Sequence, residues 1–269
     1  MRLFFGMTIL AVAAHGQWIG YKVAGVPRTS DGKPNLTAPA PRVNGKPDFT
    51  GIWATHPAKY GEAETVIPGI GILAVPGDDP AGMSKYFFSV LADYKPDEIQ
   101  MTAAALDKQK SMRPPPSACI PPSPPMADAL PVGRRVIQTD KLIAILYEGP
   151  VPRQIHLDGR PLPEDPQPSY TGYSVGKWDG DVLVVETIGI HDTTPLDAMG
   201  HPRSSAHRIT ERIRRRDYGH MDVEVTIQDP LFYTKPITYR FTETLSPDDD
   251  VIEWICENER DAPHMRGPQ

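Results

Sequence analysis

Short stretches in which hydrophobic and polar residues alternate follow one another from Val132 to the end of the chain, separated by loops rich in Gly, Pro, Asp and Asn. This period of two is typical of β-strands that place one face in a core. We therefore expect residues 132–269 to form a mostly β, antiparallel core, either a barrel or a sandwich. The expected strands are residues 135–138, 142–147, 153–157, 172–178, 182–190, 206–216, 221–228, 237–245 and 251–258.

A tight hairpin is expected within residues 172–190. Asp179-Gly180 is a strong signal for a two-residue hairpin loop. With those two residues at the turn, Gly176 faces Leu183. Gly176 then shares a face with Gly172, and such small side chains leave room for a neighbouring element to pack closely.

A second hairpin, within residues 206–228, places a carboxylate in the core. The loop Asp217-Tyr218-Gly219, with its glycine in the left-handed conformation, pairs Glu211 with Val225. Glu211 then lies on the apolar face of its strand, and His207 lies on the same face at the strand's end, where we expect water to reach it. Because a buried ionisable group is costly unless it is paired, this face is a candidate site.

A proline-rich arm, residues 17–131, precedes the core and is expected to supply the first strand and one or two helices. Residues 83–94 carry apolar side chains at helical spacing, and residues 96–111 begin with Pro-Asp-Glu, a typical helix start. Many of the 31 prolines lie within residues 112–131 and 161–168. Since proline donates no ladder hydrogen bond, these stretches are expected to wrap the surface, and arm and core to form one domain.

The N-terminus predicts export. Residues 1–16 combine a positive start at Arg2, an apolar run too short to span a bilayer, and small residues suited to cleavage. They are interpreted as a signal peptide, with a periplasmic or secreted mature protein that does not insert into a membrane. An N-terminal apolar anchor is the alternative.

Export changes the interpretation of the two cysteines, Cys119 and Cys256. In an oxidising compartment two cysteines are most simply one disulfide. Two separate buried thiols remain the alternative.

The net charge of −6 excludes a basic nucleic-acid-binding surface as the general character of the chain. A local run of arginines, Arg212 and residues 214–216, is interpreted as a solvated strand face. We expect a small organic molecule as the partner, and no nucleic acid.

Candidate chemistry is concentrated around Glu211. A carboxylate on an apolar face has a raised pKa unless a cation or hydrogen-bond donors stabilise it, and such carboxylates serve as general acids and bases. The loop that leads to its strand adds Asp192 and Asp197 as further catalytic candidates. No metal-binding motif is present in the sequence, so neither a metal nor a cofactor is expected. The candidate ligand-binding residues are Tyr173, His191, His201, His207 and Tyr239.

Two resemblances add to this picture. Gly51-Ile52-Trp53 at the first strand is similar to the Gly-x-Trp of lipocalin-like (calycin) barrels, which implies a tryptophan plugging one end of a barrel. Most of the chain after the signal resembles a family of uncharacterised exported bacterial proteins. Family members often carry Asn at the position of His191, which favours Asp192, Asp197 and Glu211 as site residues. The stretches that carry the family resemblance are Asp48-Phe49-Thr50-Gly51-Ile52-Trp53, Tyr147-Glu148-Gly149, Asp158-Gly159-Arg160-Pro161, residues 172–181, Thr210-Glu211-Arg212, residues 229–236 and Cys256-Glu257-Asn258.

Two hypotheses about function follow, from different classes. In the first, the exported barrel is an enzyme of hydrolase or lyase type, whose Glu211, Asp192 and Asp197 carry out acid–base chemistry on a small organic substrate. In the second, it is a non-catalytic ligand-binding protein of lipocalin type, and these groups orient the ligand. A structural surface protein, which needs no pocket, is the third possibility.

Overall fold

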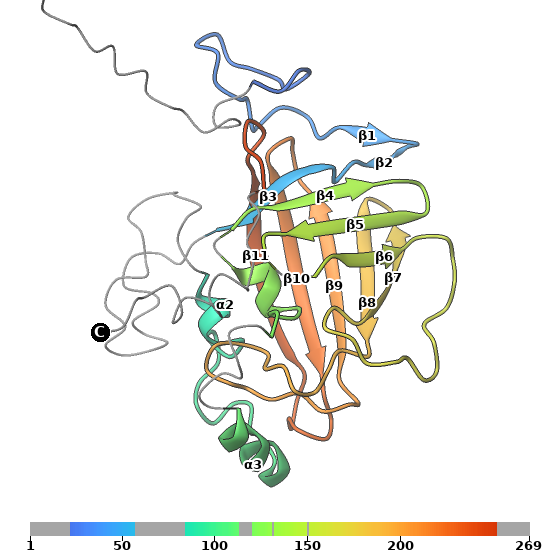
Figure 1. The fold of residues 1–269 in the computed structure, drawn as a ribbon. Helices are drawn as coiled ribbons and strands as arrows, with labels where there is room; N and C mark the ends of the chain where they lie inside the picture. The colour runs from blue at the N-terminus through green and yellow to red at the C-terminus, as the bar shows by residue number, and fades with distance from the viewer. Residues whose placement is uncertain (1–21, 57–83, 113–119, 131, 150, 252–269) are drawn as a thin grey trace, which may run out of the picture.

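The computed structural model describes residues 22–56, 84–112, 120–130, 132–149 and 151–251. Within them nine strands close into a barrel, and a two-stranded hairpin of β1 (Arg42–Val43) and β2 (Lys46–Pro47) lies beside it (Figure 1). The prediction of a mostly β barrel with few helices is confirmed. The barrel strands are β3 (Gly51–Thr55), β4 (Arg134–Gln138), β5 (Leu142–Tyr147), β6 (Arg153–His156), β7 (Tyr173–Asp179), β8 (Val182–Ile188), β9 (Arg208–Arg215), β10 (His220–Gln228) and β11 (Ile237–Leu245).

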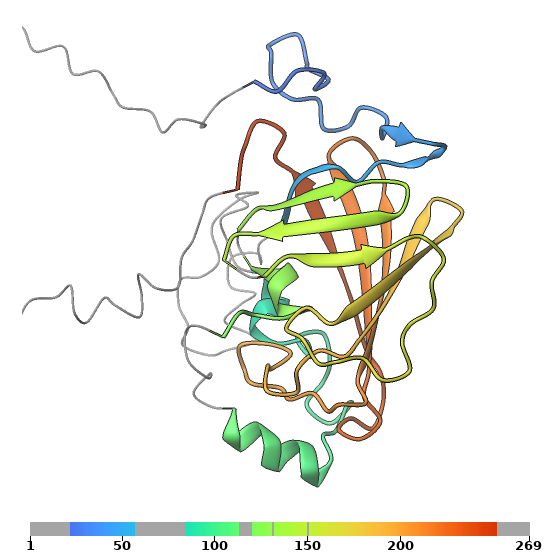
Figure 2. The same cartoon turned by 45° about the vertical axis from the view of Figure 1, so that its right-hand side comes forward.

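The strands follow one another around the barrel in chain order, and β11 pairs with β3 to close it. Strand directions can alternate all the way around a closed ring only when the number of strands is even. Nine strands therefore require a parallel pair, and here it is β6 with β7; the other barrel ladders are antiparallel, in agreement with the expected mostly antiparallel sheet. The proline-rich segment 157–172 carries the chain from the end of β6 to the start of β7, so that both run the same way (Figure 2).

The two predicted hairpin registers had different outcomes. Between β9 and β10, Glu211 pairs with Val225 as predicted. Between β7 and β8 the predicted register is wrong, because Gly176 pairs with Val185. Gly180 has a φ of 59° and occupies the first position of the two-residue loop, where primed turns require a positive φ. The glycine, and not the preceding aspartate, therefore begins the turn.

The helices are shorter than predicted. Helix α2 (Lys85–Phe88) ends at Ser89, which is extended, and the next N–H, that of Val90, donates to Asp197 and not to a helical carbonyl. Helix α3 (Ala103–Ser111) begins seven residues later than predicted, because Thr102 caps it by accepting a hydrogen bond from a backbone N–H of its first turn.

Other expectations lie outside the described residues: the signal peptide at 1–16, the Cys119–Cys256 bond and the strand at 251–258.

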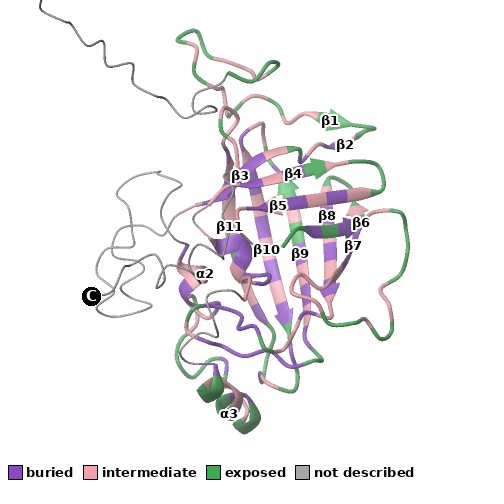
Figure 3. Cartoon of the chain, viewed as in Figure 1, coloured by how far each residue is buried: buried purple, intermediate pink, exposed green. Residues whose placement is uncertain are grey.

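Inward-facing side chains fill most of the barrel, and the alternation of buried and partly exposed positions is visible along its strands (Figure 3). Trp53 on β3 is fully buried, and its indole N–H donates to the Phe49 carbonyl at 2.8 Å. The guanidinium of Arg215 lies 4.9 Å from the centre of the Trp53 ring. These residues lie at the end of the barrel where β9 turns into β10. At the far end Leu196 and Val90, from outside the strands, pack into the barrel.

Gly176 confirms the close approach expected at its position. A Cβ there would lie 2.6 Å from Leu157 and 3.1 Å from Ile155, so the neighbouring β6 segment occupies the space that a side chain would need.

Among the described residues no helix is both long and apolar enough to span a membrane.

Candidate functional site

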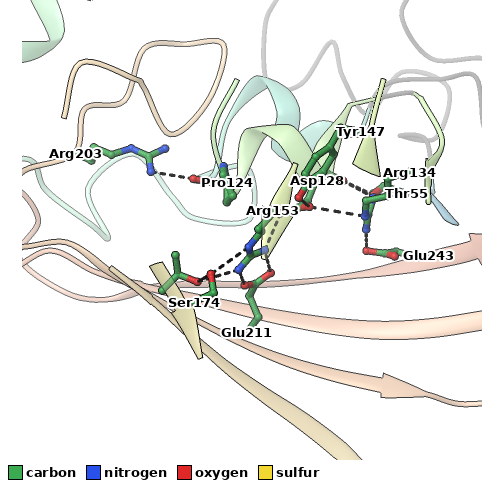
Figure 4. Close-up of polar contacts among 11 residues, drawn as sticks. Thr55, Pro124, Asp128, Arg134, Tyr147, Arg153, Ser174, Arg203, Glu211 and Glu243 are labelled. Carbon is green, nitrogen blue, oxygen red and sulfur yellow. Dashed lines mark hydrogen bonds and ion pairs between the residues drawn. The ribbon is translucent and has the colours of Figure 1, made fainter. Parts of the chain in front are cut away.

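A cluster of buried charged groups occupies the middle of the barrel, and Arg153 lies at its centre (Figure 4). Its guanidinium binds both carboxylate oxygens of Glu211, one of them at 3.0 Å. The same guanidinium donates to Ser174 at 3.3 Å and to Thr187 at 2.9 Å. Burial lowers the pKa of Arg153, but the Glu211 carboxylate more than offsets this, so that the pKa lies above its usual value. Glu211, the sharpest candidate from the sequence, is thus one half of a bidentate buried ion pair.

Asp128 joins this pair to a second one. It lies on the short 3-10 helix η1 (Met126–Ala129), and one carboxylate oxygen is 3.6 Å from Arg153. The other accepts a hydrogen bond from the Tyr147 hydroxyl at 2.7 Å and lies 3.7 Å from Arg134. Burial, with the Asp128 charge next to it, raises the pKa of Tyr147 well above its usual value. Tyr147 therefore stays protonated as a hydrogen-bond donor.

The second pair consists of Arg134 and Glu243. Arg134 binds one carboxylate oxygen of Glu243 and also donates to the Asp128 carbonyl at 3.3 Å. The other Glu243 oxygen, Oε2, is buried and has no hydrogen-bond partner among the described residues. Thr55 donates to the same Asp128 carbonyl, so the first strand of the barrel is tied to η1 as well.

The pleat of the strands accounts for these positions. Arg134 shares the inward face of β4 with Val136, and Arg153 shares that of β6 with Ile155. Since side chains two residues apart along a strand lie on the same face, each charge is held among apolar neighbours.

The cluster borders an interior cavity of about 40 Å³. Apolar side chains cover most of its wall, and five ionisable side chains complete the lining. A cavity this small holds a few water-sized groups and is far below the roughly 300–1,000 Å³ of sites for drug-sized ligands. The lining residues are Phe49, Asp128, Arg134, Val136, Ile143, Ile145, Arg153, Ile155, Leu183, Glu211, Ile213, Met221, Val223, Phe241 and Glu243.

The loop between β8 and β9 forms a second polar group at the far end of the barrel. Asp197 is fully buried; it accepts the Val90 N–H at 2.8 Å and lies 2.5 Å from Nδ1 of His201. Arg203, equally buried, donates to three backbone carbonyls, those of Pro124, Thr194 and Pro195. Burial lowers the pKa of Arg203 to about 10. These contacts hold the loop in place, and Asp197 with His201 lies apart from the cavity lining.

His207 is 1 % exposed, so the expectation that water reaches it is wrong. Its Nδ1 lies 2.6 Å from the Ser204 carbonyl, which fixes the proton on Nδ1, and its buried Nε2 has no partner among the described residues. Burial, assisted by the nearby Arg203 charge, lowers the pKa of His207 to about 4. The imidazole is therefore neutral at pH 7.

The remaining candidates lie away from the cluster. Asp192 is half-exposed and pairs with Lys108 at 3.2 Å. The His191 ring lies 5.1 Å from that of Tyr170. Tyr173 lies on the outer face of β7, where its hydroxyl accepts a hydrogen bond from Arg160 at 3.2 Å. Tyr239 points inward, but its ring packs on that of Tyr86 and does not line the cavity.

Of the sequence-predicted site residues, Glu211 alone belongs to the cavity lining. Sequence reasoning assigned no role to Asp128, Arg134, Arg153 and Glu243. One signal was available: Glu243 falls on the inward face of its strand with Tyr239, as Glu211 does on its own. Two inward carboxylates require inward cations, and arginines on the inward face of β4 and β6 supply them.

No protein-family model, curated protein or solved structure matches the chain. Among the described residues no three His, Cys, Asp or Glu side chains are grouped so as to hold a metal ion. The buried ion cluster and its cavity are therefore the features from which a function is inferred.

Replacing Arg153 with Met should cost about 3–5 kcal/mol of unfolding free energy, because it leaves Glu211 buried without its cation. The double variant Arg153→Met/Glu211→Leu should recover most of this loss, since it removes both charges. Urea denaturation at pH 7 measures both. The matched control is Arg212→Met. Arg212 lies on β9, the strand that carries Glu211, and forms an exposed pair with Asp179, so its loss should cost less than about 1 kcal/mol. A double variant as unstable as the single one would contradict the ion-pair account.

Acidification should destabilise the protein through His207. Its pKa of about 4 in the folded state lies below the usual value of 6.5. The contribution of neutral His207 to the free energy of unfolding is therefore fully present above pH 6.5 and is lost as the pH falls towards 4. The loss is about 1.4 kcal/mol per pH unit within that window. His207→Gln should show a correspondingly shallower decline in urea midpoints measured between pH 7 and pH 4. Equal slopes in the two proteins would exclude His207 as the cause.

Proposed function

We propose that the protein is an exported β-barrel that binds a small molecule in its interior cavity, beside the buried ion cluster. The observation that carries the proposal is the character of that cavity, whose wall is mostly apolar and includes a small number of buried charged groups. This combination is typical of ligand sites, where apolar contacts supply affinity and a few polar groups fix the orientation.

Binding is better supported than acid–base catalysis. A general base must be directed at its substrate, whereas both oxygens of Glu211 are directed at the guanidinium of Arg153. Asp192 and Asp197, the other catalytic candidates, have partners elsewhere and do not line the cavity. The hypothesis of a hydrolase or lyase would therefore need other residues than these three.

The size of the cavity limits the ligand. A cavity needs roughly 10–15 Å³ to hold one water molecule. A cavity of about 40 Å³ therefore accepts a ligand of about three or four heavy atoms. The best small ligands gain about 1.5 kcal/mol per heavy atom. A three-atom ligand is therefore expected to bind no tighter than about 0.5 mM.

The test is an NMR titration of ¹⁵N-labelled protein at pH 7 with ethanol, ethylamine and acetate. At least one should cause saturable shifts centred on the cavity-lining strands. Val136→Ile adds a methylene group to the cavity wall and should weaken binding at least five-fold. The matched control Val184→Ile, on the partly exposed face of β8, should leave it unchanged. No saturable shift with any of the three, or binding unaffected by Val136→Ile, would refute the proposal.

Export is supported by the N-terminal sequence and by the resemblance to exported proteins. The secreted form is expected to begin near residue 17, which intact-mass analysis of periplasmic or culture fractions measures. The same material should carry no free thiol, and reduction of a Cys119–Cys256 bond should lower stability by roughly 4–5 kcal/mol in the chain-entropy model. Free thiols in the secreted protein would contradict the disulfide, and an uncleaved N-terminus would contradict the signal peptide.

A further inference from the structure

The buried charges around the cavity are unequal in number. Three carboxyl groups, those of Asp128, Glu211 and Glu243, face two guanidinium groups, those of Arg134 and Arg153. All five residues are less than 10 % exposed, and among the described residues no further Lys, Arg or His lines the cavity. Because an uncompensated buried charge is costly, the cluster is complete only with one more positive charge.

The Glu243 carboxylate has an open position for this additional positive charge. Both oxygens of Glu211 bind Arg153, and the two oxygens of Asp128 face Tyr147 and Arg153. Glu243 uses Oε1 to bind Arg134, whereas its buried Oε2 has no partner among the described residues. An acceptor that is both buried and unsatisfied costs free energy until a donor reaches it. Oε2 is thus the open acceptor in the cavity wall.

The rest of the wall determines the other half of the ligand. Phe49 and Phe241 contribute aromatic rings and Val136 and Ile145 aliphatic groups, so a fully hydrated cation would lose water contacts there without replacement. A hydrocarbon chain of two or three carbons suits this surface. A negatively charged ligand would meet an excess of carboxylates.

We propose that the cavity selects a small primary alkylamine in its ammonium form, with the ammonium group donating to Glu243 Oε2 and the alkyl chain against the apolar wall. This inference rests on the proposed binding function and specifies its ligand class. An alkylamine, like the side chain of lysine, is protonated at pH 7, so it supplies the missing charge and the missing donor together.

The experiment compares Kd values for ethylamine, ethanol and acetate, from the NMR titrations above. Ethylamine should bind about ten-fold more tightly than ethanol, in keeping with a charge-assisted hydrogen bond, and acetate should bind most weakly. Glu243→Gln keeps the shape and removes the charge; it should weaken ethylamine binding about ten-fold and change ethanol binding less than two-fold. The matched control Glu224→Gln, which alters a carboxylate paired with Arg240 on the outer face of the adjacent strand, should leave all three constants unchanged.

Each outcome separates this inference from the proposed function. If ethanol or acetate binds in the cavity and ethylamine binds no more tightly, the barrel is a binding protein but the ammonium selectivity is wrong, and the third carboxyl carries a proton. Selectivity retained in Glu243→Gln would overturn the role of Oε2. If none of the three binds, both proposals fail. Should Glu243→Gln not fold, the order of the three constants in the unaltered protein still decides.

Discussion

The ion pair between Arg153 and Glu211 joins strands across the place where the barrel has its fewest paired residues. An odd number of strands requires a parallel pair, and β6 and β7 share only two residue pairs, Ile155 with Ser174 and His156 with Val175. The Arg153 guanidinium extends from β6 to Ser174 on β7, Thr187 on β8 and Glu211 on β9. Four consecutive strands are therefore joined by one side chain across a short ladder. Arg153 compensates locally for a constraint that follows from the strand count.

The buried charged side chains also determine which groups line the interior of the barrel. Charged groups in a barrel core are stable only when most of their hydrogen-bonding capacity is met, and here eight strands and η1 supply side chains that contribute to meeting it. Asp128 connects the two ion pairs, so that Arg134 and Arg153 share one carboxylate between them. Because the cluster and the apolar side chains fill most of the barrel, the space that remains is small, and its mostly apolar wall includes five charged side chains. A large lipocalin-type ligand is thereby excluded from this interior in the conformation described.

The positions of most strands and one of the two predicted hairpin registers follow from the sequence because they depend on near neighbours. The pairing of Glu211 with Val225 requires only a three-residue loop and strict alternation, and it was predicted. The inward positions of Arg134 and Arg153 were not predicted, because each of these residues begins a strand, where a charged residue is normally taken as exposed. The partners of such residues lie far away in the chain: Arg134 and Glu243 are 109 residues apart. Similarly, α2 ends where Asp197, more than a hundred residues later, takes the Val90 N–H.

Ionisable residues that are close together along the chain have partners in different parts of the structure. Asp192, Asp197 and His201 lie within one loop, yet Asp192 pairs with Lys108 at the surface and Asp197 with His201 inside the loop that closes the barrel. Asp197 and His201 pair with each other, and Arg203 donates to the carbonyls of Pro124, Thr194 and Pro195, so little capacity is left for a ligand. In the ion cluster one atom, Glu243 Oε2, still has capacity for a ligand, because no donor among the described residues reaches it. A site is therefore better located by an unmet hydrogen bond at a cavity than by the density of ionisable residues in the sequence.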